Sequence, residues 1–417
     1  MSTSQFDLMQ PIPEANWATS PTATWLIEHG QAKLTATELI GQLCDRLVSE
    51  GVPLTRVSCG MLAMHPQVFA RGINWRRGEK AEEVGRAHGI QTTPLYLESP
   101  VALIHQGAAA IRRRLDVAEP QLDFPILHDL KTEGATDYAM MPVRFTNGRT
   151  NYISWTTDRP GGFTTVQLSL LWSLLPLLAL RLEIESGYNV TDTLLTTYLG
   201  HNAAQKVLAG TVQPGQGSTI SAAIWYSDLR GFTAMSDRLP QEEMIATLDE
   251  YFECMARSVQ LFGGEVLKFI GDGMLAIFEV QRGDMQQSAC RALNSALDAM
   301  GRLAELNRKR AETGRAALRV GIGLHVGDVI YGNIGAADRL DFTVIGPAVN
   351  EVCRVEAYCV RLERPLLTTA RFQQLACDTR LQSVGFHGLR GVREPQELYA
   401  LPPEALAAVA APTGKSG

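Results

Sequence analysis

The chain has 417 residues, of which 45% are apolar and 20% charged, and it carries a formal net charge of −6. This length allows two or three domains with sizeable cores, and the composition is that of an ordinary soluble protein. The acidic balance excludes nucleic-acid binding through a global positive field, so we expect no nucleic-acid partner. A local anion site is compatible with it.

Cysteine usage and hydropathy indicate a reducing compartment and no membrane span. The seven cysteines are scattered without a C-x-x-C pair, which supports neither a disulfide framework nor structural zinc. The N-terminus lacks a basic region followed by an apolar core, so we expect no secretory signal. The most apolar run, 168–180, has about 13 residues, whereas a bilayer span needs about 20. We therefore predict a cytoplasmic protein.

The first half opens with a polar, proline-containing segment of about 20 residues, and we assign 1–35 to an N-terminal tail and lead-in. Apolar residues at helical spacing predict a helix over 35–50, and a strand follows over 56–63. Helical spacing is also seen over 100–115. These patterns predict a mixed α/β domain.

The clearest element of this half is a β-hairpin over 137–157, where Asn147-Gly148 separates two alternating apolar runs. A leucine-rich helix then reaches about Glu185. The order of elements over 36–185 resembles a GAF-type sensory domain, in which an antiparallel sheet holds a small-molecule pocket. The resemblance implies an unidentified small molecule or cofactor as signal. A dimerising scaffold without ligand is the alternative, and no spacing groups the histidines as haem or metal ligands.

Leu174, Leu178, Leu180 and Leu182 favour a packing or dimer seam, and residues 186–211 predict a helical linker. Pro214-Gly215-Gln216-Gly217 is a flexible break. We therefore place a second domain at 212–403 and a flexible tail at 404–417.

The second domain begins with a strand that ends at Asp228, followed by a turn. Phe232 and Thr233 open a helix that we expect to continue to Leu261. A carboxylate at such a position suits a metal–phosphate site, because it holds the cation while free backbone N–H groups at Phe232 and Thr233 meet the substrate anion. Aspartate is also a common turn residue, so this pattern alone leaves a structural role open.

A second carboxylate lies in a predicted hairpin over 263–278, whose tip is Gly271-Asp272-Gly273. A plain hairpin needs neither Asp272 at its tip nor Lys268 in its first strand. Two aspartates on neighbouring strands are the minimal equipment for a two-metal site, which suggests phosphoryl or nucleotidyl transfer.

The remaining signals fall between residues 318 and 354. Residues 318–335 predict a strand, a glycine-bearing break and a second short strand that ends in a tight loop. A helix that follows carries Asn350 and Arg354, which share one face because they are four residues apart. An amide and a guanidinium on one face could hold a ribose and a phosphate together.

Four motifs occur in order: SDLRGFT, GGEVLKFIGDGMLAIF, GIGLHVGDVIYGNIG and DFTVIGPAVNEVCRVE. They resemble the catalytic domain of class III nucleotidyl cyclases, the adenylate and guanylate cyclase family, over about 215–400. The resemblance implies an α+β fold with a ferredoxin-like βαββαβ core, preceded here by the α/β GAF-like domain and the helical linker. It also implies a homodimer, with active sites shared between two catalytic domains arranged head to tail.

Carried over position by position, the resemblance implies that Asp228 and Asp272 bind two divalent cations per site, Mg²⁺ or Mn²⁺. The backbone carbonyl of Leu229 is a further ligand. From the partner domain, Lys268 meets a ring nitrogen of the purine and Thr343 its exocyclic amino group.

Three further residues match substrate-contacting positions of the family. Asn350 matches the residue that orients the ribose, and Arg354 the one that stabilises the pentavalent phosphorus. Arg390 matches a basic position on the triphosphate tail, where lysine is commoner. Pro347 stands where aspartate is frequent, and we expect it to change the turn rather than the chemistry.

These assignments imply an adenylate cyclase that converts ATP to 3′,5′-cyclic AMP and pyrophosphate and is regulated by its N-terminal domain. Guanylate-selective members carry Glu and Cys at the positions of Lys268 and Thr343, which disfavours the guanylate cyclase alternative. A non-catalytic nucleotide-binding signalling module is disfavoured because both aspartates are present. A diguanylate cyclase would carry a Gly-Gly-Asp-Glu-Phe type turn, which is absent.

Overall fold

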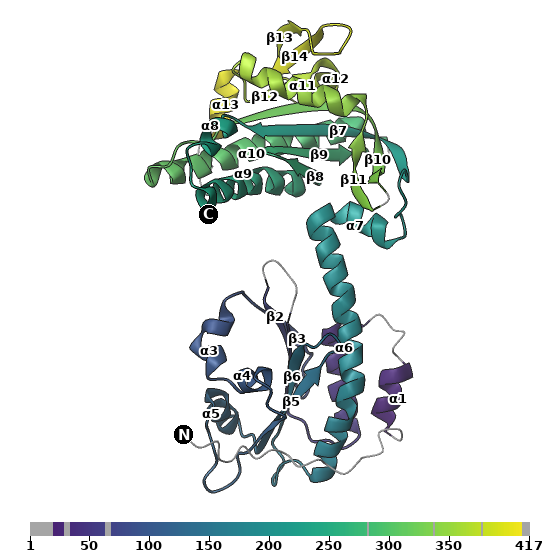
Figure 1. The fold of residues 1–417 in the computed structure, drawn as a ribbon, viewed down its shortest axis with the longest axis vertical. Coiled ribbons are helices and arrows are strands. Elements are labelled where there is room, and N and C mark those ends of the chain that lie inside the picture. The colour runs from purple at the N-terminus through teal and green to yellow at the C-terminus, as the bar shows by residue number, and fades with distance from the viewer. Residues whose placement is uncertain are drawn as a thin grey trace. The chain divides into compact units, whose positions relative to one another are not determined.

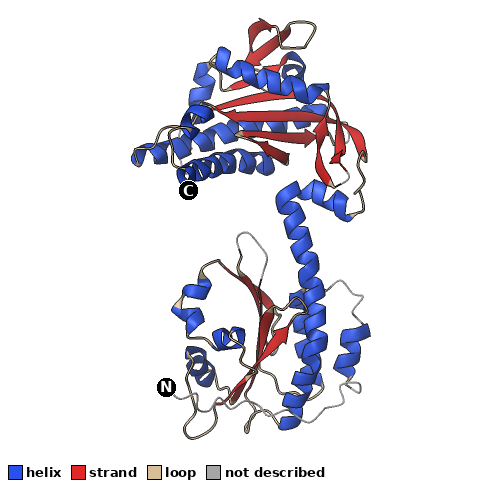
Figure 2. Ribbon diagram, in the orientation of Figure 1, coloured by secondary structure: helices blue, strands red, loops and turns tan. Residues whose placement is uncertain are grey.

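The chain divides into two compact units, Met1–Leu194 (unit 1) and Leu195–Gly417 (unit 2), each with its own sheet and core (Figures 1 and 2). The computed structural model describes residues 20–28, 34–62, 68–281, 283–336, 338–376 and 378–410. The greater part of the predicted N-terminal tail, and residues 411–417 of the predicted C-terminal tail, lie outside these ranges.

Unit 1 contains a six-stranded antiparallel sheet in the order β3-β2-β1-β6-β5-β4. In Figure 1, α6 lies on one side of this sheet and α3, α4 and α5 lie on the other. The elements in chain order are α1 Pro21–Glu28, α2 Ala36–Ser49, β1 Arg56–Leu62, β2 Ala70–Arg76, β3 Glu82–Arg86, the 3₁₀ turn η3 Ile90–Thr92, α3 Pro94–Leu97, α4 Pro100–His105, β4 Ile111–Arg114, α5 Pro125–Thr132, β5 Asp137–Arg144, β6 Thr150–Thr157 and α6 Thr165–Leu199.

The predicted helix over 35–50 and hairpin over 137–157 are confirmed as α2 and as β5 paired with β6. Thr35 and Glu38 form a reciprocal capping box at the start of α2. The predicted helix over 100–115 is present only over its first six residues, as α4. Helix α4 ends at His105 because Gly107 takes a left-handed conformation (φ 105°), and the following residues form β4, which pairs with β5.

Helix α6 is one continuous helix, whereas the sequence predicted a helix to about Glu185 and then a separate linker segment. It is long and apolar enough to cross a bilayer by length and composition alone. In the structure it contributes to the core: Leu171 and Leu182 are fully buried against α2 and the sheet.

Unit 2 contains an eight-stranded sheet in the order β13-β14-β12-β10-β7-β9-β8, with β11 paired to β10. In Figure 1, α9 and α10 lie on one side of the sheet and α11 on the other. The elements are α7 His201–Leu208, β7 Gly217–Leu229, α8 Phe232–Ser236, α9 Gln241–Leu261, β8 Glu265–Ile270, β9 Gly273–Glu279, α10 Met285–Glu312, β10 Val320–Ala336, β11 Arg339–Ile345, α11 Pro347–Arg361, β12 Leu366–Thr369, α12 Ala370–Leu375, β13 Gln382–His387, β14 Gln396–Ala400 and α13 Pro403–Ala410.

The predicted βαββαβ order is present as β7-α9-β8-β9-α10-β10, and these four strands lie side by side as β10-β7-β9-β8. The hairpin over 263–278 is confirmed as β8 and β9. The fold of unit 2 is therefore α+β, with two helices covering one face of a largely antiparallel sheet.

Three details of unit 2 differ from the sequence expectations. The helix expected from Phe232 to Leu261 is divided, because Pro240 caps α9 and cannot continue α8. Residues 318–335 do not contain a break: β10 is one strand of 17 residues, paired with β7 along the full length of β7. Part of the expected C-terminal tail forms α13, whose Ala405 packs into the core.

The hairpin depends on a tight approach at Gly264, just before β8. A Cβ atom there would lie 2.6 Å from the ring of the buried Phe278 and 2.8 Å from Val259. We expect Gly264→Ala to destabilise unit 2 by about 1–3 kcal/mol through overpacking. Gly388→Ala is the matched control, because nothing lies within 4 Å of its added Cβ and its φ is not positive. Thermal unfolding followed by circular dichroism measures both, and equal melting temperatures would contradict the packing argument.

Candidate active site

The register of the central strands brings two aspartates together. Asp228 lies at the end of β7, directly opposite Gly273, the first residue of β9. Asp272 precedes Gly273 in the two-residue turn that joins β8 to β9, and Gly271 makes this turn possible at φ 62°. A Cβ on Gly273 would lie 2.5 Å from the hydroxyl of Tyr226, so glycine there allows the two strand ends to close up.

The two carboxylates interact unfavourably. Partial burial, together with the charge of Asp272 and a hydrogen bond between the two side chains, raises the pKa of Asp228 to about 6, against a smaller lowering by Arg230. A divalent cation between the carboxylates would relieve this repulsion.

The donor set fits Mg²⁺ or Mn²⁺. Carboxylate and carbonyl oxygens are the ligands that these hard cations prefer, and the buried Leu229, next to Asp228, offers its backbone carbonyl. Within the described ranges, no group of three or more His, Cys, Asp or Glu side chains forms a metal cage. Two side chains, a carbonyl, water and substrate phosphates would therefore have to complete the coordination.

Lys268 and Thr343 lie on two strands that come together, β8 and β11. The ammonium Nζ of Lys268 lies 3.6 Å from Oδ2 of Asp341. Thr343 is two residues further along β11, on the same face as Asp341. Its side chain is buried, and its hydroxyl lacks a hydrogen-bond partner among the described residues. A buried hydroxyl without a partner costs free energy, so it marks a position where a ligand atom would be stabilising.

Helix α11 carries Asn350 and Arg354 one turn apart, and the residues before β14 approach it. Asn350 is exposed, and Arg354 is partly exposed. A Cβ on Gly391 would lie 3.2 Å from Nη2 of Arg354, so the loop that holds the exposed Arg390 runs beside Arg354. Pro347 is the first residue of α11, a position that favours proline. Three of the predicted polar residues therefore share one edge of unit 2.

Two residues that the sequence analysis missed connect the aspartates to α11. Arg230, two residues after Asp228, lies 3.5 Å from Glu356 of α11, and both side chains are largely buried. Burial raises the pKa of Glu356 to about 7, partly opposed by Arg230. A Cβ on Gly321 would collide with both side chains, so the glycine in β10 makes room for the pair. Arg230 follows Asp228 by two residues, and Glu356 follows Arg354 by two residues. This closeness in sequence to predicted site residues was the signal that could have identified them.

The other predicted residues have plainer surroundings. Phe232 and Thr233 open α8 after Gly231, which has a left-handed conformation. His325, to which no role was assigned, is buried, and burial lowers its pKa to about 4, so it is neutral beside Glu351 and Thr369. In the parts of the chain that the structure describes, no hydrogen bond or ion pair joins the aspartates to Lys268, Thr343, Asn350 or Arg390.

Comparison with known proteins gives this arrangement a family. Residues 216–402 match the family described as adenylate and guanylate cyclase catalytic domain. This segment of unit 2 is a class III nucleotidyl cyclase domain.

Two curated relatives and one solved structure each match part of the chain. An adenylate cyclase of Anabaena cylindrica is 33% identical over 167 residues, which is 40% of this chain and 33% of that protein. Adenylate cyclase 1 of Rhizobium meliloti is 32% identical over 133 residues, 31% of this chain and 20% of that protein. The crystal structure of the guanylyl cyclase Cya2 is 31% identical, with a TM-score of 0.39, and the match covers 44% of this chain and 92% of that one. The chain therefore spans a third or less of these curated relatives.

The carboxylate pair of the cyclase domain generates a pH-dependent prediction. Because the pKa of Asp228 is raised in the folded domain, ionisation of Asp228 lowers the free energy of unfolding. This loss is absent below the pKa of the unfolded chain, near pH 4, and is complete above pH 6. We expect Asp272→Asn to stabilise the metal-free cyclase domain at pH 7.5 by on the order of 1 kcal/mol, after allowance for the partial exposure of Asp228. The gain should disappear near pH 4.5.

Thermal unfolding at the two pH values, with and without Mn²⁺, measures this effect. Mn²⁺ should raise the melting temperature of the wild-type domain at pH 7.5 more than that of Asp272→Asn. Equal stabilisation of both proteins by Mn²⁺ would show that the carboxylates do not hold the ion.

Proposed function

We propose that the protein is an adenylate cyclase, which converts ATP to 3′,5′-cyclic AMP and pyrophosphate at a site shared by two copies of the chain. The observation that carries the proposal is the carboxylate pair Asp228 and Asp272 in a domain that also presents Lys268, Thr343, Asn350 and Arg354. A module that only binds nucleotide needs no such pair.

Preference for ATP over GTP follows from donor and acceptor chemistry. A lysine ammonium donates only, which suits N1 of adenine, an acceptor, and not N1–H of guanine, a donor. Asp341 would hold Lys268 in place, since the two charges lie 3.6 Å apart. The partnerless hydroxyl of Thr343 can accept a hydrogen bond from the adenine amino group. Guanylate cyclase remains the alternative activity.

The proposed reaction is an internal displacement at the α-phosphorus. The bond from the ribose 3′-oxygen to phosphorus forms while the bond to pyrophosphate breaks, and the 3′-hydroxyl proton is lost to solvent. Mg²⁺ or Mn²⁺, two per site, held by Asp228, Asp272 and the carbonyl of Leu229, would supply charge neutralisation and acidify the hydroxyl.

The other proposed contacts come from the partner copy and position the substrate. Asn350 orients the ribose, and Arg354 stabilises negative charge on the phosphorus oxygens. Arg390, beside Arg354, binds the triphosphate tail. Backbone groups at Phe232 and Thr233 lie at the start of α8, close after Asp228, and would meet the phosphates from the metal side.

A homodimer is proposed because one copy holds only half of the proposed site and leaves several apolar side chains exposed. Phe269 and Ile270 on β8 and Ile345 at the end of β11 are 51%, 46% and 44% exposed. Exposed apolar residues gathered near a functional site are typical of an association surface. The same strands carry Lys268 and Thr343, so association and base recognition would use one surface.

The N-terminal part, 36–185, is proposed as a GAF-like sensory domain, followed by a linker over 186–211 and a catalytic domain over 212–403. The cytoplasm is the proposed location. An antiparallel sheet with a cavity on one face supports the sensory role. Helix α7 of the linker packs within unit 2 next to β8: Glu265 accepts hydrogen bonds from Ala203 N (3.2 Å) and Asn202 Nδ2 (3.1 Å). A change in α7 would therefore reach the strand that carries Lys268.

Product analysis with purified full-length protein tests the activity. With Mn²⁺, we expect cyclic AMP from ATP with a kcat/KM at least about tenfold above that for GTP, because one mismatched polar contact is worth about 1.4 kcal/mol or more. Lys268→Glu combined with Thr343→Cys should reverse the preference. A higher kcat/KM for GTP in the wild type would overturn the ATP assignment, and no cyclic product from either nucleotide would overturn the enzyme.

Mixing variants tests the shared site. Asp272→Ala and Asn350→Ala should each be inactive alone, whereas their mixture should recover about a quarter of wild-type activity, since half of the dimers are mixed and one of their two sites is intact. A mixture of Asp228→Ala with Asp272→Ala is the control and should stay inactive, because both changes affect the same half of the site. An inactive first mixture would contradict the shared-site arrangement.

A further inference from the structure

One face of the sheet in unit 1 carries a row of small and polar residues. Ser58 of β1 is paired with Asn74 of β2 on one side and with Ser154 of β6 on the other, so three polar side chains form one row across the sheet. The opposite face carries the fully buried Trp75 and Trp155 and forms the core with α2 and α6. On the cavity side, a hydrophobic cluster that includes Tyr138 and Met140 fills only the part of the sheet under α4 and α5, and the polar row lies beside it.

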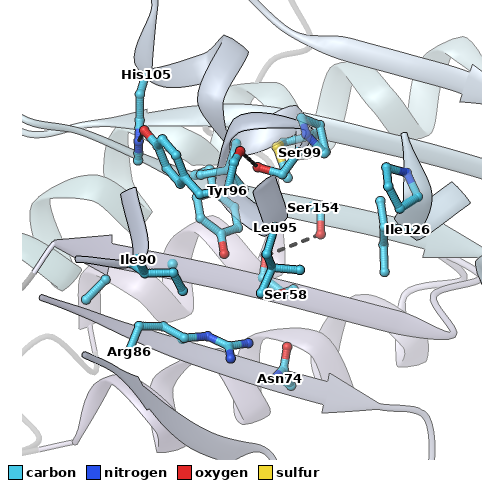
Figure 3. Close-up of a pocket in the computed structure, with 18 of the residues that line it drawn as sticks. Ser58, Asn74, Arg86, Ile90, Leu95, Tyr96, Ser99, His105, Ile126 and Ser154 are labelled. Atoms are coloured by element: carbon cyan, nitrogen blue, oxygen red, sulfur yellow. Dashed lines mark hydrogen bonds between the residues drawn. The ribbon is translucent and has the colours of Figure 1, made fainter. Parts of the chain in front are cut away.

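A cavity of about 350 Å³ lies over this polar face. Figure 3 shows Ser58, Ser154 and Asn74 on the sheet, with Leu95, Tyr96 and Ile126 facing them from the helices that cover it. Tyr96 is fixed by a 2.8 Å hydrogen bond between its hydroxyl and Nδ1 of His105. The volume is within the range of small-molecule sites, and an apolar roof over a few polar groups is their usual composition.

The polar groups of the floor are only partly satisfied within the protein. The hydroxyls of Tyr138 and Tyr152 interact with Ser154 and Ser58 respectively. Among the described residues, no side chain forms a hydrogen bond with the amide of Asn74. The hydroxyl of Ser154 donates to the carbonyl of Ser58 at 3.4 Å, so the amide of Asn74 is the group that keeps both donors and an acceptor available above the sheet.

The charge at the edge of the cavity is positive. Glu98 is the only carboxylate among the lining residues, against three arginines. Arg71 is paired with Glu83 at 2.6 Å, and Arg56 lies 3.7 Å from Glu133. Arg86, at the end of β3, has no carboxylate partner in the described part of the chain. In Figure 3 its guanidinium extends over the sheet toward Asn74, and its charge acts on the hydroxyl of Tyr152 inside the cavity.

We propose that unit 1 binds a small organic carboxylate in this cavity, with its carboxylate on Arg86 and its apolar body, aromatic or aliphatic, under Leu95 and Ile126. A planar guanidinium matches a carboxylate with two parallel hydrogen bonds. One unpaired arginine indicates one anionic group, and the floor of Ser58, Asn74 and Ser154 takes polar atoms of the body. This site is separate from the nucleotide site and does not depend on cyclase activity.

Calorimetric titration of the full-length protein with matched probes tests the proposal. The probes are two pairs: indole-3-acetate with indole-3-acetamide, and octanoate with octanamide. The two members of each pair are almost equal in size and differ in charge. At least one carboxylate should bind one per chain with an affinity about tenfold or more above that of its amide. Arg86→Gln should lower the carboxylate affinity to that of the amide and leave the amide unchanged. The exposed Arg144→Gln, at the end of β5, is the matched control and should change neither.

A second variant locates the binding. Ser154→Leu places an apolar side chain in the cavity and should abolish binding of both members of a pair, while the melting temperature of unit 1 reports that it remains folded. The proposal is overturned if neither carboxylate gives a saturable one-to-one isotherm, or if acid and amide bind equally. The proposal is also overturned if the Ser154→Leu protein still binds the probes, or if the Arg86→Gln protein still binds a carboxylate more tightly than its amide.

Discussion

The repulsion between Asp228 and Asp272 is the constraint on which the catalytic domain depends. Two carboxylates without a paired cation are unfavourable, and a chain would avoid the arrangement unless other interactions imposed it. Here strand pairing holds the two carboxylates close together. Thirteen residues of β7 are paired with β10, and seven with β9, so the end of β7 cannot move away from the β8–β9 turn without loss of ladder hydrogen bonds. The sheet therefore holds the carboxylates in a state that a divalent cation would stabilise.

The same constraint extends to α11 through a buried ion pair. Arg230 follows the strand end closely, and it forms an ion pair with Glu356, two residues after Arg354 on α11. Both terminal nitrogens of Arg230 are buried without a hydrogen-bond acceptor in the described ranges. A buried pair with imperfect geometry adds little stability compared with apolar packing, but removal of one partner is strongly destabilising. The pair thus fixes α11 relative to the aspartates more than it stabilises the fold.

The sequence predicted elements that are determined by residues close together in the chain. It did not predict elements that are determined by pairing between distant strands. Gly271-Asp272-Gly273 and Asn147-Gly148 are local turn signals, and both hairpins are present. The roles of Asp228, Asp272, Asn350 and Arg354 follow from the resemblance of the four motifs to the cyclase family, and they stay predictions. By contrast, the glycines of β10 suggested a break, whereas its pairing with β7 keeps it extended. Asp341 and Glu356 were within quoted motifs, yet their roles depend on contacts with Lys268 and Arg230 that no local pattern contains.

Glu265 connects α7 with β8, the strand that carries Lys268. It is 9% exposed, and both of its oxygens accept hydrogen bonds from the hydroxyl of Tyr331 at 2.8–2.9 Å. The remaining donors, from Asn202 and Ala203, belong to α7. Withdrawal of α7 would leave a buried carboxylate with fewer donors, at a cost of about 1–3 kcal/mol for each lost partner. Because Glu265 is in β8, three residues before Lys268, that cost falls on the strand that would read the purine. In the proposed function, a shift of α7 would therefore act on the position of Lys268.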